Sequence, residues 1–325
     1  MKPHLVTLTL FLALGIATSG FAQESDLVES KKPKRAAYVL ATKHLPNAIQ
    51  VHERVISGGQ PAGESAFREL SELGIKTIIS VDGAKPDVEL AKKFGLRYVH
   101  LPHGYNGIQQ ERIDELAKAV RDLEGPIFIH CHHGKHRSPS AAAAACVSAG
   151  LIEPIEALPI LKLAGTNENY IGLFESARSA TKLSSTYLDQ LTPEFPETAK
   201  LPPMAEAMVE LERTHDHMKR LSESGWKSLP DHPDLTAAHE ALLLREHFTE
   251  MLRMEYVTKQ PAGFSMLLKE SEADALLLEK AIQQWKSTSN STSLPADQTE
   301  PFRRITANCI NCHKQYRDIP IQKSR

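Results

Sequence analysis

The first half of the chain alternates between two patterns of hydrophobic and polar positions. Short apolar or β-branched runs, typical of buried strands, are separated by amphipathic runs with helical spacing. The predicted strands are 49–56, 76–81, 97–101 and 126–130. The predicted helices are 63–73, 87–94, 111–123 and 140–149. Because strands that alternate with helices form parallel sheets, this pattern predicts an α/β domain with a parallel sheet and helices on both faces.

The pattern changes after a segment at 183–203 that contains several prolines and is predicted to be a linker. Beyond it the strand pattern disappears, and four runs carry apolar residues spaced three and four apart. These runs contain Met204, Ala241, Ala275 and Phe302. The spacing predicts an all-α four-helix bundle over 204–318.

The N-terminus has the pattern of a secretory signal peptide. Lys2 is followed by an apolar core at 5–16 and by small residues at 20–22. This core is too short to span a bilayer comfortably. We therefore expect an exported, periplasmic protein with a signal peptide at 1–22, a polar leader at 23–45 and the α/β domain at 46–182.

Length and composition set broad limits. A chain of 325 residues suggests two domains. With 41% hydrophobic residues, 24% charged residues and a net charge of −2, the chain shows no bias towards nucleic acid, and we expect no nucleic-acid partner.

A compact motif follows the predicted strand 126–130. Cys131 and Arg137 are separated by five residues, and Ser138 begins a run rich in alanine. A strand, a tight loop and a helix N-terminus together form an anion site, in which backbone N–H groups and the helix dipole favour a thiolate. An arginine side chain can bind two phosphate oxygens at once. The sequence therefore predicts that Cys131 is a nucleophile facing a phosphate held by Arg137.

This arrangement of His130, Cys131, Arg137 and Ser138 resembles the protein tyrosine phosphatase superfamily, and 134–137 resembles the loop of compact atypical dual-specificity phosphatases. The likeness covers roughly 45–180. It implies hydrolysis of a phosphorylated protein or small molecule through a phosphocysteine, with Ser138 assisting release of the phosphate. The residues expected to bind phosphate are His132, His133, Gly134, Lys135 and His136. Their positive charge, when the histidines are protonated, would suit a densely charged substrate.

The general acid of this reaction is not obvious from the sequence. Members of the superfamily usually place an aspartate about thirty residues before the cysteine, but 98–107 contains no carboxylate. Asp82, at the end of the strand 76–81, should reach the sheet edge where the loop lies. We predict Asp82 as the acid, although it could simply cap the next helix. The alternatives are His103, or a substrate whose leaving group needs no acid.

A second motif stands near the C-terminus. Cys309, Cys312 and His313 form C-x-x-C-H, the attachment sequence for c-type haem. A redox cysteine pair usually opens a helix after a strand, and a zinc site would need a second cysteine pair; neither feature is present in the sequence. The motif predicts one covalent haem c, with His313 as an iron ligand.

Residues 200–318 resemble the class II cytochromes c, the cytochrome c′ group. The resemblance implies that Arg317 lies near the haem propionates. It leaves the opposite face of the iron either empty or filled by Met204 or Met208. An empty face would suit a diatomic gas, whereas a methionine would suit electron transfer with a redox partner. The resemblance also suggests a homodimer.

Two other functions remain open from the sequence. The protein could be a haem electron-transfer or gas-binding protein whose phosphatase-like domain only binds an anion. It could also be a thiol or sulfur-transfer enzyme that carries a persulfide on Cys131.

Overall fold

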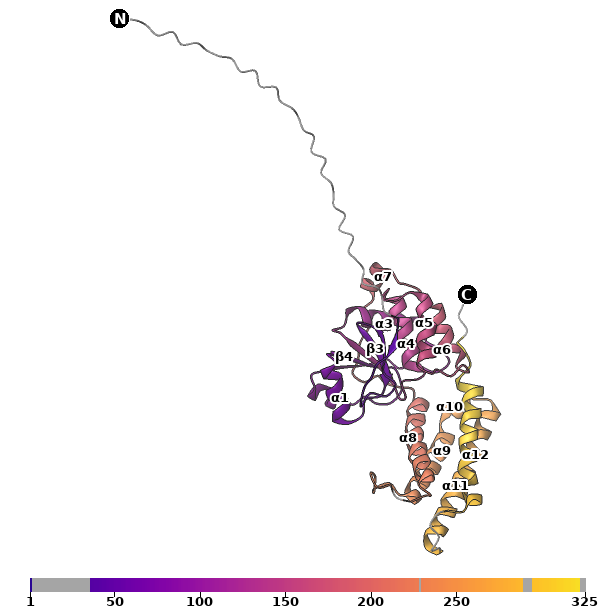
Figure 1. Cartoon of the computed structure of the whole chain (residues 1–325). Helices are drawn as coiled ribbons and strands as arrows, with labels where there is room; N and C mark the ends of the chain where they lie inside the picture. The colour runs from indigo at the N-terminus through magenta and orange to yellow at the C-terminus, as the bar shows by residue number, and fades with distance from the viewer. Residues whose placement is uncertain (2–35, 228, 289–293, 322–325) are drawn as a thin grey trace. The chain divides into compact units, whose positions relative to one another are not determined.

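A computed structural model describes Met1 and residues 36–227, 229–288 and 294–321 (Figure 1). Residues 2–35 lie outside the described residues; they include the predicted signal peptide at 1–22 apart from Met1, and residues 23–35 of the predicted leader. Ala36–Arg325 form one compact unit.

The sheet is mixed. Its strands are β1 (Tyr38–Val39), β2 (Ile49–His52), β3 (Val55–Gly59), β4 (Thr77–Ser80), β5 (Arg97–His100) and β6 (Ile127–Cys131). They are ordered β1-β2-β3-β6-β4-β5. The pairs β3–β6, β6–β4 and β4–β5 are parallel, as the pattern predicts, whereas β1–β2 and β2–β3 are antiparallel. The prediction of a wholly parallel sheet was therefore wrong at this edge.

The antiparallel edge arises where one predicted strand is a hairpin. The run 49–56 turns at Glu53 and Arg54, so that β2 and β3 pair with each other. The backbone N–H of Arg54 donates to Nδ1 of His52 at 3.2 Å, and its side-chain Nε donates to the carbonyl of Val120 at 2.7 Å. Arg54 thus closes the turn and ties it to the helix that contains Val120.

Helices cover both faces of the sheet. They are α1 (Gly63–Glu72), α2 (Val88–Lys93), α3 (Gln110–Asp122), α4 (Arg137–Ser148), α5 (Pro154–Leu163), α6 (Ile171–Ser179) and α7 (Ser185–Gln190). Because successive strand residues point to opposite faces, Ile78 and Phe128 join one apolar core with Phe67 of α1. Ile79 and Ile129 join the core on the other face.

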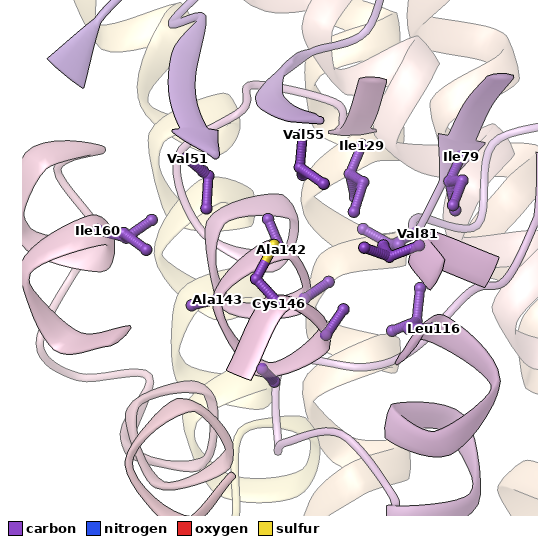
Figure 2. Packing of buried hydrophobic residues seen from close by; sticks show 14 of the residues in the cluster. Val51, Val55, Ile79, Val81, Leu116, Ile129, Ala142, Ala143, Cys146 and Ile160 are labelled. Atoms are coloured by element: carbon purple, nitrogen blue, oxygen red, sulfur yellow. The ribbon is translucent and has the colours of Figure 1, made fainter. Parts of the chain in front are cut away.

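Helix α4 packs closely on the sheet because its buried side chains are small. Figure 2 shows Ala142 and Cys146 of α4 among Val55 and Ile129 of the strands, with Leu116 of α3 beside them. Cys146 is fully buried, and burial raises the pKa of its thiol. It is a free cysteine and packs as a small apolar side chain. This packing places the N-terminus of α4 at the end of β6.

The C-terminal region is helical. It contains α8 (Pro203–Glu223), α9 (Ala237–Arg253), α10 (Glu255–Thr258), α11 (Ala262–Thr288), α12 (Ala296–Cys312) and the π-helix η1 (His313–Arg317). Helix α9 packs against α8 and α11, and α11 packs against α12, around one apolar core. None of the helices within the described residues has the length and apolar character needed to cross a membrane.

Hydrogen bonds and an ion pair hold the segment 183–203 against the α/β region. It contains α7, whose Tyr187 hydroxyl donates to the carboxylate of Asp114 at 2.6 Å. Further along, Glu197 pairs with Lys92 at 2.9 Å, and the carbonyl of Pro196 accepts from the N–H of His100 at 2.8 Å. This predicted linker therefore follows the α/β region over much of its length.

Candidate active site

Cys131 is the last residue of β6, between β3 and β4 in the middle of the sheet. Its side chain is buried, and its Sγ lies 3.4 Å from Oγ of Ser138 in the first turn of α4. The Ser138 hydroxyl donates to the carbonyl of Gly58 at 3.0 Å. The structure thus brings Cys131 and Ser138 together at the carboxyl edge of the parallel strands, where α/β proteins bind ligands.

The loop between β6 and α4 is held through its carbonyl groups. The N–H of Gln60 donates to the carbonyl of His132 at 3.1 Å, and Oγ1 of Thr166 donates to that of Lys135 at 2.6 Å. Nδ2 of Asn47 donates to the carbonyl of Gly134 at 2.9 Å. In a trans peptide the N–H points away from the C=O of the same unit. Outward-bonded carbonyls therefore turn the intervening N–H groups towards the other side of the loop, which suits an anion.

Arg137 begins α4 beside this loop. Its side chain is buried, and its guanidinium lies over the ring of Tyr105, with Cζ 4.6 Å from the ring centroid. Burial opposes the charged form of Arg137, but the neighbouring acidic groups Tyr105, Cys131 and Asp82 raise its pKa. The arginine is therefore held as a cation within electrostatic reach of the cysteine.

The histidines of the loop differ in charge. Burial, with the positive charges of His133 and Lys135, lowers the pKa of His136 to about 4. Burial and the charge of His132 also lower the pKa of His133. Asp216 of α8 instead raises the pKa of His132 by accepting a hydrogen bond from its imidazole, whose Nε2 lies 3.5 Å from the Asp216 carboxylate. At neutral pH, His136 is thus neutral, whereas the raised pKa of His132 favours a cation that is paired with Asp216. The positive charge that is not paired in this way rests on Lys135 and Arg137.

Asp82 follows β4 and is buried at the same edge of the sheet. One carboxylate oxygen accepts from the N–H of Ala84 at 2.9 Å. The other oxygen is buried and has no hydrogen-bond partner among the described residues. The contact with Ala84 makes Asp82 a turn residue, but Asp82 does not cap the next helix as the alternative interpretation expected, because the N-cap of α2 is Asp87.

His103 lies in the segment between β5 and α3. Its Nδ1 is 2.9 Å from the carbonyl of Gly104, and burial lowers its pKa to about 4. The imidazole is therefore neutral at neutral pH, which disfavours His103 as a cationic acid.

Three residues near the loop were not singled out from the sequence. Tyr105 contacts the guanidinium of Arg137, Asn47 binds the loop backbone, and Asp216 pairs with His132. Tyr105 lies in the stretch 98–107, which contains no carboxylate, and an aromatic residue in that stretch was the available signal. Asp216 carried no such signal, because it lies far away in sequence on α8.

The C-x-x-C-H residues lie at the end of α12 and the start of η1. Cys309 and Cys312 are free thiols, and burial raises the pKa of Cys309 to about 11. Burial and the charge of Arg317 lower the pKa of His313 to about 3, so its imidazole is neutral, as metal ligation requires. No cluster of three or more histidine, cysteine or carboxylate side chains suited to a metal ion occurs in the part of the chain that the structure describes. Two thiols followed by a neutral imidazole are the side chains that covalent attachment of a c-type haem uses.

The other residues predicted around the haem lie as follows. Met204 and Met208 of α8 are half-buried and pack, like Cys309, against the apolar core of the helical region. Nε of Arg317 donates to the carboxylate of Asp318 at 2.7 Å.

Several solved structures are similar to part of this chain. The crystal structure of P. aeruginosa TpbA is 18% identical, with a TM-score of 0.38 and coverage of 44% of this chain and 90% of that chain. A putative phosphatase from Shewanella putrefaciens is 18% identical, with a TM-score of 0.34 and coverage of 42% and 95%. The catalytic domain of the PP-IP phosphatase Siw14 from S. cerevisiae is 16% identical, with a TM-score of 0.35 and coverage of 43% and 86%. No protein-family model and no curated protein matches the chain.

Proposed function

We propose that the α/β region is a cysteine-dependent phosphatase that hydrolyses phosphate monoesters. The observation that carries this proposal is the placement of Cys131 at the end of β6, beside Ser138 and with Arg137 buried at the start of α4. A thiol, a guanidinium and a helix N-terminus converge there on a loop whose carbonyls are bonded outwards. That combination supplies a nucleophile and the donors that stabilise a transferring phosphoryl group.

The reaction has two steps. The thiolate of Cys131 attacks phosphorus, so that an S–P bond forms while the P–O bond to the leaving group breaks, and the leaving oxygen receives a proton. Water then attacks phosphorus, the S–P bond breaks, and phosphate is released as the water gives up a proton to the conjugate base of the acid. Arg137 and the loop N–H groups hold the equatorial oxygens throughout. In the second step the Ser138 hydroxyl would turn its one hydrogen from the carbonyl of Gly58 to the departing thiolate, 3.4 Å away.

Asp82 is our candidate for the acid. It is the buried carboxylate at this edge with one oxygen unpartnered in the described structure, and His103 is neutral at neutral pH. We expect Asp82→Asn to retain most turnover of an aryl phosphate, whose leaving group needs no proton. The same variant should lose about 10²-fold or more with an alkyl phosphate. Equal losses with both substrates would exclude Asp82 as the acid.

The direct test of the activity is phosphate release from an aryl phosphate by the full chain. We expect turnover that Cys131→Ser abolishes. A folded protein without turnover that still binds phosphate would favour the alternative in which this region only binds an anion. A persulfide on Cys131 without phosphate release would favour sulfur transfer.

The charged side chains of the loop bear on which phosphorylated substrates it would bind. Lys135 is exposed, while Arg137 is buried and charged. We propose a phosphorylated protein or small molecule, with the loop backbone at Gly134 and the side chains of His132, His133, Lys135 and His136 lining the approach. Because His136 is neutral above about pH 4, preference for a densely charged substrate would depend on Lys135.

We further propose that the helical region is a four-helix bundle of the cytochrome c′ type that binds one haem c. Cys309 and Cys312 would attach the porphyrin through thioether bonds, and the neutral imidazole of His313 would bind the iron. When bound, the haem would supply reversible one-electron chemistry or a site for a diatomic gas. The test is whether haem absorbance stays with the denatured polypeptide. We expect it to stay with the wild type and to be lost in Cys309→Ser/Cys312→Ser. Extraction of haem from the denatured wild type would contradict this assignment.

Two further parts of the proposal are the ligand at the sixth coordination position of the haem iron, opposite His313, and the cellular location. A methionine ligand, Met204 or Met208, would favour electron transfer with a redox partner, whereas an empty position would bind CO without displacing a ligand. Export to the periplasm follows from the signal peptide predicted at 1–22 and from the place where c-type haem is attached. Fractionation of cells, with sequencing of the mature N-terminus, tests it. A homodimer stays a prediction.

A further inference from the structure

Tyr105 contacts two arginines that come from different regions of the chain. The Cζ atom of Arg137 lies 4.6 Å from the centroid of its ring, and that of Arg317 lies 4.1 Å from the same centroid. Arg137 begins α4 at the phosphate loop, whereas Arg317 ends η1, directly after the C-x-x-C-H motif. One aromatic ring therefore connects the arginine of the loop with the haem-motif segment.

The ring is held from several sides. Tyr170 lies 4.7 Å from it between ring centroids, and His136 lies 6.3 Å away. The next residue, Asn106, accepts a backbone hydrogen bond from Ile321 at 2.9 Å. A side chain on Gly172 of α6 would overlap the carbonyl of Asn106, so the backbone beside Tyr105 is closely packed. Tyr105 is thus anchored between α6 and the C-terminal segment.

Arg317 is anchored as well. Its Nε donates to Asp318 at 2.7 Å, and the N–H of Asp318 donates to the carbonyl of His313 at 2.9 Å. The carboxylate of Asp318 offsets much of the charge of Arg317, which lets a second guanidinium share the same aromatic ring. Each guanidinium is attracted by the electron-rich face of the ring, more strongly where it is buried.

Arg137 needs such support. Its Nε is buried and has no hydrogen-bond partner among the residues described. Stacking on Tyr105 is therefore a contact that helps to fix where its guanidinium lies. A guanidinium that binds two phosphate oxygens must keep its plane and direction, and a displacement of about 1 Å can cost about 10²-fold in rate.

We propose that Tyr105 is a positioning residue for Arg137 and that Arg317 holds Tyr105 in place, so that the segment after C-x-x-C-H completes the phosphate site. This inference rests on the proposed phosphatase function. It makes the helical region a structural part of the site rather than a neighbour on the same chain.

The test measures phosphate affinity without turnover. The full-length, haem-loaded Cys131→Ser protein is titrated with inorganic phosphate in a calorimeter, and variants are made in that background. Tyr105→Leu should weaken binding about 5- to 30-fold, the fold-change that corresponds to the loss of about 1–2 kcal/mol. Tyr105→Phe keeps the ring and should stay within about twofold of the parent.

Arg317→Gln should weaken phosphate binding about fivefold, because the ring loses one of its two cations. The matched control is Arg303→Gln, which removes an exposed arginine from α12 that pairs with Glu300, and it should bind like the parent. In proteins with Cys131 intact, the KM for an aryl phosphate should rise for Tyr105→Leu and Arg317→Gln but not for Arg303→Gln.

These measurements distinguish a failure of the inference about Tyr105 and Arg317 from a failure of the proposed phosphatase function. Parental phosphate affinity in folded Tyr105→Leu and Arg317→Gln would overturn the inference alone. A changed haem spectrum in Arg317→Gln with unchanged phosphate affinity would also overturn it, and would assign Arg317 to the haem only. If the Cys131→Ser parent binds no phosphate and the wild type shows no turnover, the proposed function itself fails.

Discussion

At the scale of single residues, Gly134 shows why the loop has its sequence. Gly134 has φ of 70°, a conformation that L-residues with a side chain rarely adopt. A Cβ there would overlap the backbone of Gly58 and Gly59, on which the loop rests. The glycine is therefore required twice, for its backbone conformation and for close packing against the end of β3.

We expect Gly134→Ala to displace the loop and lower kcat/KM by about 10²-fold, because the N–H groups and Cys131 lose their alignment. Gly165→Ala is a matched control. Gly165 has φ of 74°, but nothing lies near a Cβ there, so only the backbone strain is introduced. Steady-state kinetics should show a large loss for the first variant and little change for the second; similar activities in both would contradict this role of Gly134.

His130 is a buried group whose protonation opposes folding. Its Nε2 lies 2.6 Å from the Tyr98 hydroxyl, and burial lowers its pKa to about 4 from an ordinary value of 6.5. Between these values the unfolded chain binds more protons, so the free energy of unfolding falls as the pH is lowered from 6.5 to 4. The contribution of His130 to this fall is about 3 kcal/mol.

His130→Gln keeps a polar group near the Tyr98 hydroxyl but cannot be protonated in this range. We expect its free energy of unfolding in urea to depend less steeply on pH between 6.5 and 4 than that of the wild type. The difference should amount to about 3 kcal/mol over the range. Parallel pH profiles for the two proteins would show that His130 is not held neutral by the fold.

The residues of the phosphate loop could be predicted from the sequence because they are contiguous. A strand, Cys131, a loop glycine, Arg137 and Ser138 follow one another, and local backbone geometry brings them together. Tyr105 could not be assigned in this way. Its contacts with Arg137 and Arg317 depend on how segments far apart in the sequence pack, and no local pattern encodes them.

At the scale of elements, the central strands and their helices follow the hydrophobic periodicity. The hairpin β2–β3 does not, because residues 52–54 contain none of the glycine, proline or asparagine that usually mark a tight turn. The register also shifts between Gln50 and His52, which interrupts the alternation of the strand. A continuous run of strand-forming residues thus hid a reversal of chain direction.

Helix α8 contacts the phosphate loop through one ion pair. Asp216 holds the pKa of His132 above its ordinary value of 6.5, and the pKa of Asp216 is lowered by the same hydrogen bond. Because the pKa of His132 is raised and that of Asp216 is lowered, the pair contributes fully to stability between about pH 3.8 and 6.5, the ordinary pKa values of the two groups. Its contribution falls as the pH drops through the folded-state pKa of Asp216. It is also lost as the pH rises through the folded-state pKa of His132.

We expect Asp216→Asn to bring the pKa of His132 back towards 6.5, measured by NMR titration of the imidazole protons. Glu210→Gln is the control, because Glu210 is a carboxylate of the same helix that pairs with Arg213 instead. An unchanged pKa of His132 in Asp216→Asn would show that α8 does not contact the loop in this way.

At the scale of the whole molecule, two apolar cores lie on the faces of the sheet and a third lies within the helical region. The change from strand to helix periodicity near residue 200 predicted this change in architecture, because each pattern reports which faces must be buried. The contacts between the phosphate loop and the helical region could not be predicted. They depend on complementary surfaces, such as His132 with Asp216, that leave no periodic pattern.

The central claim is that Cys131 forms a covalent bond to phosphorus during turnover. The most direct measurement mixes the full chain with an aryl phosphate, quenches the reaction rapidly, and maps phosphate on the peptides by mass spectrometry. We predict phosphate on Cys131, more of it in Ser138→Ala because release is slowed, and none in Cys131→Ser. Turnover with phosphate on a different residue, or on none in any of these proteins, would contradict the account.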